Sequence, residues 1–210
     1  MPSRTILTIW IGANVILWFM ILWILGTPLL SFLYLKPFGI VISLNVAFCS
    51  AFNWYIWACP FINKLIKRPD MRGTWRLTVT SSWQDPHTQT QIPPIIAYAI
   101  IRQTFSSFSL RVITKESSSK LISYSLAAQE DGLFILTAVF RNEPNISIRG
   151  VRSELHYGSF ILNIHGQPVD SLDGYYWTDR ATKGSMSLTS RSNKLCETYE
   201  EASLLFEETR

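Results

Sequence analysis

The 210-residue sequence has few of the residues, and none of the short motifs, that mark common catalytic and metal sites. Its three cysteines, Cys49, Cys59 and Cys196, form no C-x-x-C pair, so neither a zinc site nor a redox pair is indicated. The three histidines are scattered, and no G-x-S-x-G, P-loop or H-E-x-x-H motif occurs. We therefore expect no catalytic residue, no metal and no cofactor, and an enzyme is the less favoured class.

Charged side chains are absent from two long intervals near the N-terminus. No Asp, Glu, Lys or Arg occurs between Arg4 and Lys36, or between Lys36 and Lys64. Residues 5–25 and 39–59 are largely apolar, and about 20 such residues cross a hydrocarbon core as a helix. A cleaved signal peptide would have a shorter apolar core. The sequence therefore predicts a hairpin of two transmembrane helices.

Positive charge predicts how this hairpin is oriented. Lys36 stands alone in the connection between the spans, whereas Arg4 precedes the first span. Four further basic residues follow the second span: Lys64, Lys67, Arg68 and Arg72. By the positive-inside rule, the N-terminus and everything after the second span face the cytoplasm.

Three asparagines lie inside the predicted spans, at Asn14, Asn45 and Asn53. An amide in hydrocarbon is costly unless it finds a partner, so we expect these side chains to form hydrogen bonds between helices. Bonds within one hairpin and bonds between copies of the protein, as oligomer contacts, are equally consistent with the sequence.

The hydrophobic pattern changes after the hairpin, which occupies residues 1–66, and a polar linker at 67–72. Over residues 73–194, apolar and polar residues alternate in about eight short segments separated by turn residues, as in antiparallel strands. Closing such a sheet removes its edges, so we expect a small eight-stranded antiparallel β-barrel, with a two-sheet sandwich as the alternative. Residues 195–210 have helical spacing and predict a short amphipathic, acidic helix. The predicted fold class is therefore membrane-anchored all-β.

The alternation also predicts which side chains face the barrel interior. They lie on the first, fourth and sixth strands: Trp75, Leu77, Val79 and Trp83; Ile122, Tyr124 and Leu126; His156, Phe160, Leu162 and Ile164. An eight-stranded barrel is either filled by its own side chains or holds one small ligand, so the strand number does not decide the function.

Two stretches combine aromatic rings with guanidinium groups, "YAIIRQTFSSFSLR" at 98–111 and "DGYYWTDRATKG" at 173–184. Aromatic faces stack on planar bases, and arginine forms strong hydrogen bonds with phosphate oxygens. Arginines near strand ends would lie at a barrel mouth, where both contacts are available to one ligand. The candidate ligand-binding residues are Trp83, Tyr98, Arg102, Gln103, Thr104, Tyr176, Thr178 and Arg180.

Taken together, the two N-terminal spans and the motifs "RPDMRGTW", "IRQTFSS" and "YWTDRATKG" resemble a known architecture. They are similar to the CD-NTase-associated protein 15 family, the two-transmembrane β-barrel effectors of bacterial CBASS antiphage defence. The resemblance implies that a partner nucleotidyltransferase makes a cyclic oligonucleotide during phage infection, foremost a cyclic dinucleotide, which the cytoplasmic barrel binds. It further implies self-association in the inner membrane, membrane disruption and death of the infected cell, with no DNA or RNA polymer as partner.

Two other functions remain open from the residues alone. A membrane-tethered barrel carries a lipid or another apolar ligand in some proteins, and a structural barrel is filled by its own side chains. A nucleotide sensor needs arginine near a cavity, a lipid carrier needs an uncharged cavity, and a structural barrel has none.

Overall fold

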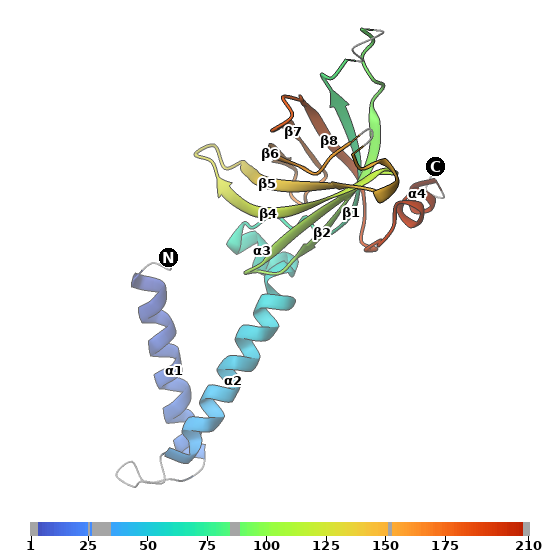
Figure 1. Cartoon of the computed structure of the whole chain (residues 1–210). Coiled ribbons are helices and arrows are strands. Elements are labelled where there is room, and N and C mark those ends of the chain that lie inside the picture. The colour runs from blue at the N-terminus through green and yellow to red at the C-terminus, as the bar shows by residue number, and fades with distance from the viewer. Residues whose placement is uncertain (1–3, 25, 27–34, 85–88, 151–152, 208–210) are drawn as a thin grey trace. The chain divides into compact units, whose positions relative to one another are not determined.

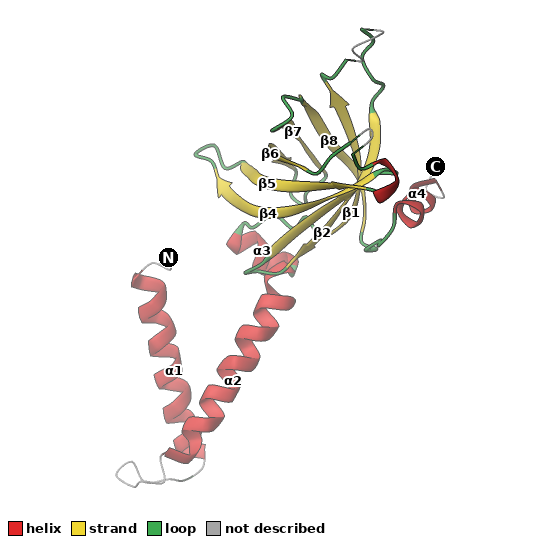
Figure 2. Cartoon of the chain, in the orientation of Figure 1, coloured by secondary structure: helices red, strands yellow, loops and turns green. Residues whose placement is uncertain are grey.

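A computed structural model describes residues 4–24, 26, 35–84, 89–150 and 153–207, and the statements below refer to these residues. The chain divides into two compact units, Met1–Cys59 and Pro60–Arg210. Helices form the described part of the first unit, and a β-sheet dominates the second (Figures 1 and 2).

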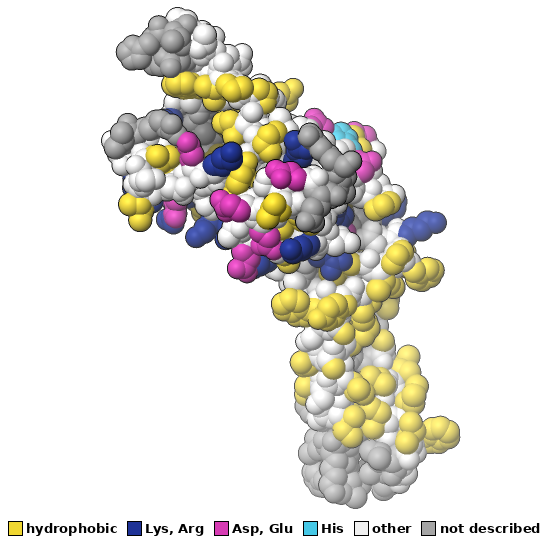
Figure 3. Space-filling model, turned by 90° about the vertical axis from the view of Figure 1, so that its right-hand side faces the viewer, with side chains coloured by type: hydrophobic (Ala, Val, Ile, Leu, Met, Phe, Trp, Pro, Cys, Tyr) yellow, Lys and Arg dark blue, Asp and Glu magenta, His cyan; other side chains and the backbone are white. Residues whose placement is uncertain are grey.

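The first unit contains two long helices, α1 (Arg4–Ile24) and α2 (Leu35–Trp54), followed by the short 3-10 helix η2 (Ile56–Ala58). Much of their exposed surface is hydrophobic (Figure 3). Within the described ranges, no helix combines the length and the apolar character that a membrane crossing requires. The predicted spans at 5–25 and 39–59 are therefore not supported as membrane crossings.

An amide pair links α1 to α2. Nδ2 of Asn45 donates to Oδ1 of Asn14, and also to the carbonyl oxygen of Val41 one turn earlier at 2.8 Å. This bond lies within one chain, which is one of the two arrangements expected from the sequence. Contacts of Asn14, Asn45 and Asn53 between copies of the protein stay a prediction.

The second unit is a closed barrel of eight antiparallel strands, preceded by the short helix α3 (Pro60–Ile66). Each strand pairs with the next along the chain, and the last pairs with the first, so the predicted barrel is confirmed and the sandwich is excluded. The 3-10 helix η3 (Ile146–Ile148) lies between the fifth and sixth strands. The strands are β1 (Gly73–Ser81), β2 (Ile95–Gln103), β3 (Phe108–Ile113), β4 (Ser117–Ala128), β5 (Phe134–Pro144), β6 (His156–His165), β7 (Ser171–Thr178) and β8 (Lys183–Ser192).

Alternate residues of the strands form an apolar core inside the barrel. Trp75 and Leu77 are fully buried in it, as the alternation predicts. The prediction for β4 was wrong at Ile122, which is exposed, whereas its neighbour Leu121 packs against the core. The cause is a register shift against β5 between Leu121 and Ser123, because one extra residue in a strand reverses the inward parity.

The C-terminal helix α4 (Tyr199–Glu207) packs against the outer face of the barrel (Figure 1). Its buried residues Ala202 and Phe206 cluster with Tyr98 of β2, and the rings of Tyr98 and Phe206 stack with centroids 5.6 Å apart. The buried apolar residues of the helix lie on one face, as predicted. The helix begins later than the predicted residue 195, and Leu195 lies outside it and is exposed.

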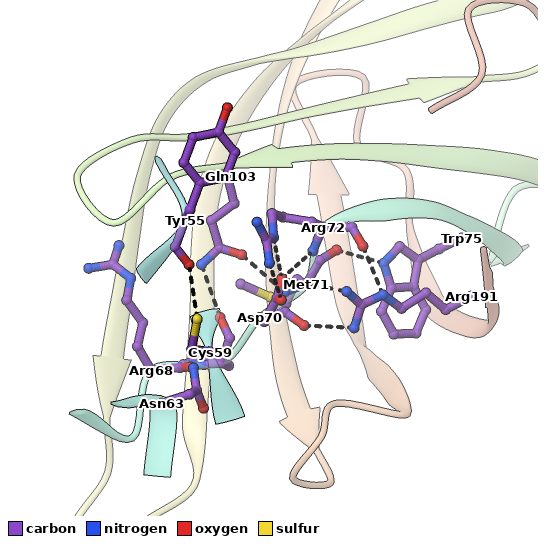
Figure 4. A network of polar contacts seen from close by, with 11 residues as sticks. Tyr55, Cys59, Asn63, Arg68, Asp70, Met71, Arg72, Trp75, Gln103 and Arg191 are labelled. Atoms are coloured by element: carbon purple, nitrogen blue, oxygen red, sulfur yellow. Dashed lines mark hydrogen bonds and ion pairs between the residues drawn. The ribbon is translucent and has the colours of Figure 1, made fainter. Parts of the chain in front are cut away.

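A network of polar contacts ties the segment before β1 to the barrel (Figure 4). The carboxylate of Asp70 accepts hydrogen bonds from Nε and Nη2 of Arg72, at 2.9 and 2.7 Å. Arg191 of β8 donates to the carbonyl oxygens of Asp70 and Arg72, both at 2.8 Å. The indole nitrogen of Trp75 donates to the carbonyl oxygen of Met71 at 2.8 Å. These bonds explain how the "RPDMRGTW" segment fixes the start of the barrel.

Replacing Asp70 with Asn should destabilise the barrel at neutral pH and much less in acid. Burial acts to raise the pKa of Asp70, but the hydrogen bonds and charge of Arg72 and the charge of Arg191 outweigh it and lower the pKa below 3.8. A group with a lowered folded pKa stabilises the fold above its unfolded pKa, and that contribution is lost as the pH falls through the folded value.

We expect the Asp70→Asn variant to lose about 1–3 kcal/mol of unfolding free energy at pH 7, because a charged hydrogen-bond acceptor is removed. The loss should shrink as the pH falls below 3.8 in parallel urea titrations of both proteins. An equal loss at neutral and acidic pH would show that the carboxylate charge is not the stabilising feature.

Candidate functional site

A cavity of about 530 Å³ occupies one end of the barrel. The residues that line it come from the C-terminal ends of the odd-numbered strands and the N-terminal ends of the even-numbered strands, which meet at the same end of an antiparallel barrel. Sites for small molecules typically measure roughly 300–1,000 Å³, so one small ligand fits. Much of the lining is apolar and includes Leu77, Leu110, Phe160 and Met186.

The strand register arranges the cavity lining in layers. Ser119 of β4, Asn142 of β5 and His156 of β6 are direct neighbours across their strands and all line the cavity. They form a row of polar side chains, which we call the polar row. Two residues before Asn142 on β5, Phe140 lies opposite Gly158, where a Cβ atom would approach the phenyl ring to 2.4 Å. Gly158 therefore leaves the space that the Phe140 ring fills.

Charged side chains also line the cavity. The cation Arg180 lies in the turn after β7 and the anion Glu116 in the turn before β4. Lys120 lies between the inward-facing Ser119 and Leu121, so its side chain faces the outer depression that contains Arg102. Nη1 of Arg180 donates to Oγ of Ser153 at 3.3 Å. Across the part of the chain that the structure describes, no group of three or more His, Cys, Asp or Glu side chains is placed to hold a metal ion. The site is therefore suited to binding an anion that also carries apolar or aromatic surface.

The turn between β7 and β8 is built from hydroxyl contacts that position Arg180. The backbone nitrogen of Arg180 donates to Oγ1 of Thr178 at 3.3 Å, and the hydroxyls of Thr178 and Thr182 lie 2.6 Å apart. Gly184 on β8 leaves room for a ring of the lining, because a Cβ atom there would lie 2.7 Å from Cε1 of Tyr176. The cavity lining thus contains the guanidinium of the turn and the phenol of β7.

Four of the eight candidate ligand-binding residues line this cavity: Trp83, Tyr176, Thr178 and Arg180. Tyr176 faces inward, whereas Tyr175 and Trp177 on either side of it are exposed. The stretch "DGYYWTDRATKG" therefore contributes only alternate residues to the site, as the two-residue period of a strand requires.

The other four candidates lie away from the cavity. Tyr98 packs against α4, and Arg102 is exposed on the outer face of β2, in a separate depression. Gln103 is buried, where its Oε1 accepts from the Met71 nitrogen at 3.0 Å and its Nε2 donates to the Pro69 carbonyl at 2.9 Å (Figure 4). The hydroxyl of Thr104 lies 2.7 Å from that of Ser107, in the turn after β2.

Strand direction explains this separation. The N-terminal end of β2 lies at the cavity, so its C-terminal end, with Gln103, reaches the opposite end of the barrel. The motif "IRQTFSS" therefore holds the linker and forms a turn, as its described contacts show.

Sequence reasoning missed several polar residues of the lining: Ser119, Asn142 and Glu116. A signal for Asn142 was present, because it has the same parity as the inward-facing Phe140 and Ala138 of β5. A polar residue at an inward position of an otherwise apolar strand needs a partner, which is either another side chain or a ligand.

Comparison with known proteins adds one family match. A family model described as "Cap15, cyclic dinucleotide receptor domain" matches residues 66–190, which include all the described residues that line the cavity. A search of curated proteins gave no match.

Proposed function

Since the chain belongs to the Cap15 cyclic dinucleotide receptor family, we propose that the cavity at the barrel end is the site that binds the cyclic dinucleotide. The observation that carries this proposal is a cavity with an apolar interior and the guanidinium of Arg180 in its lining. A cyclic dinucleotide has two phosphodiester groups with one negative charge each, and Arg180 complements one of them. Its bases would stack on the rings of Trp83 and Tyr176.

The same cavity argues against the two alternative functions. A structural barrel filled by its own side chains would leave no space of this size. A carrier of lipids would need an uncharged interior, since a buried cation without an anionic partner is costly. The lining instead contains the charged side chains of Glu116 and Arg180.

Calorimetry of the full-length chain tests the proposal. Cyclic dinucleotides should bind with one site per barrel, and the corresponding linear dinucleotides should bind more weakly because they lose conformational freedom on binding. Raising the salt concentration should weaken binding, since the phosphates interact with charged side chains. Binding of a fatty acid, without binding of any cyclic dinucleotide, would instead identify an apolar carrier.

The proposal extends to an effector role in CBASS defence. In it, a partner nucleotidyltransferase makes the cyclic dinucleotide during infection, and the barrel senses it on the cytoplasmic side of the bacterial inner membrane. Self-association of the bound protein then disrupts that membrane and the infected cell dies. This role is supported by family membership, by the charge-free intervals of the sequence and by the hydrophobic surface of α1 and α2.

A further inference from the structure

Asn142 is a buried amide in the cavity lining, with 7% of its surface exposed. Its oxygen Oδ1 accepts a hydrogen bond, but its nitrogen Nδ2 has no hydrogen-bond partner among the described residues. This nitrogen is accessible from the cavity and is not sealed in the core, so a ligand in the cavity can accept its hydrogen bond.

Ser119 determines which end of this amide is available. Its Oγ donates to Oδ1 of Asn142 at 2.8 Å, across the pair of strands β4 and β5. Because the hydroxyl engages the oxygen, the amide is left with its NH₂ group as the available donor. Ser119 thus acts as a positioning residue for Asn142.

His156, the third member of the polar row, offers the opposite polarity. Its Nδ1 lies 3.0 Å from the carbonyl oxygen of Glu154, and a carbonyl only accepts hydrogen bonds, so Nδ1 is the donor in that contact. In the neutral ring, Nε2 is then an acceptor. The register places this acceptor on the strand next to the donor of Asn142.

We propose that Asn142 and His156 read one base of the cyclic dinucleotide and select guanine or uracil over adenine or cytosine. This inference rests on the function proposed above. Nδ2 of Asn142 donates to the exocyclic oxo group of the base, O6 of guanine or O4 of uracil. Nε2 of His156 accepts the neighbouring ring N–H of the same base.

Adenine and cytosine present the reverse pattern to the same two residues. An amino group replaces the oxo group, so two donors face each other at Asn142, and an unprotonated ring nitrogen faces the acceptor of His156. A site built to form a hydrogen bond rejects a ligand that leaves its buried polar atoms unpaired. We expect a preference on the order of 10- to 100-fold, because both a bond and the solvation of the buried groups are lost.

The test compares affinities of the full-length chain for cyclic di-GMP, cyclic di-UMP, cyclic di-AMP and cyclic di-CMP. The wild type should bind the first two more tightly. Asn142→Asp keeps the size of the side chain but replaces the donor with an acceptor, so the ratio of affinities for oxo and amino bases should fall or reverse. Asn163→Asp, on the outer face of β6, is the matched control for added charge and should keep the wild-type ratio.

A second variant keeps the inference testable if Asn142→Asp does not fold. Ser119→Ala removes the hydroxyl that orients the amide, so the amide is free to turn its oxygen toward the base. Its affinity for cyclic di-GMP should fall only a few-fold, while the oxo-to-amino ratio should fall toward one.

The outcomes separate this inference from the function on which it rests. If none of the four nucleotides binds, both are overturned. If they bind but the wild type prefers adenine or cytosine, or if both variants keep the wild-type ratio, the polar row does not read the base. The receptor function would then stand, and Ser119 and Asn142 would be a structural pair.

Discussion

Replacing Arg180 with Ala should weaken binding of the cyclic dinucleotide by about 1.5–3 kcal/mol, whereas replacing Arg102 with Ala should leave binding unchanged. The sequence offers both arginines as phosphate ligands, but the structure separates them. Arg180 lines the cavity, while Arg102 is exposed on the outer face of β2. A charge-assisted hydrogen bond to a phosphate is among the stronger polar interactions, and the expected loss corresponds to roughly 10- to 150-fold in affinity.

The pair forms its own control, because each variant removes one guanidinium and one positive charge. Calorimetry at two salt concentrations would separate a direct phosphate contact from a general loss of positive charge, which salt screens. The midpoint of thermal unfolding should change little in the Arg180→Ala variant. In the wild type, the described side-chain hydrogen bond of Arg180 is an exposed 3.3 Å contact with Ser153. Equal weakening in both variants would indicate nonspecific attraction. Unchanged binding in both variants would show that neither arginine contacts the ligand.

Much of the barrel is predictable from the sequence, because successive side chains of a strand in a closed sheet point alternately to the core and to solvent. Trp75 and Leu77 follow this alternation and are fully buried. The rule fails at Ile122, because a bulge inserts one residue and reverses the parity without leaving a local signal in the sequence. Alternation therefore predicts the number of strands better than the direction of each side chain.

The site is less predictable than the fold, because residue type does not show which end of the barrel a strand reaches. The arginine and glutamine of "IRQTFSS" have the chemistry of a nucleotide site, yet Gln103 instead bonds to Met71 and Pro69 of the linker. Asn142 directly follows Phe140 and Arg141 in the sequence, but only the cross-strand register shows that it lies in the polar row. The partners of Gln103 and the neighbours of Asn142 come from segments that are distant in the sequence, so local residue type does not reveal them.

Neighbouring rings illustrate the same limit within one motif. Tyr175, Tyr176 and Trp177 are consecutive and chemically alike, but only Tyr176 lines the cavity. Gly184 on the next strand is what leaves room for that ring. The period of the strand decides that alternate rings point inward, and the packing of β7 against β8 decides which ones.

If the chain has the proposed effector role, its co-expression with an active cyclic dinucleotide synthase should permeabilise the bacterial inner membrane and stop growth. The barrel unit Pro60–Arg210 contains the whole cavity, whereas the hydrophobic helices α1 and α2 belong to Met1–Cys59. The barrel unit alone should therefore bind the nucleotide without harming the cell. Entry of a membrane-impermeant dye, followed with growth after induction, measures the effect.

Two full-length variants identify which part of the chain produces the damage. Arg180→Ala should protect the cell at moderate nucleotide concentrations, because weaker binding leaves fewer barrels occupied.

Replacing both Asn14 and Asn45 with Leu removes both members of the amide pair, so neither is left without its partner. If these amides also bond between copies, that variant should bind the nucleotide normally but leak less dye, and cross-linking should recover fewer multimers. If the double variant leaks as much dye as the wild type, the two amides bond only within one chain. If the barrel unit alone causes leakage, α1 and α2 are not the damaging element.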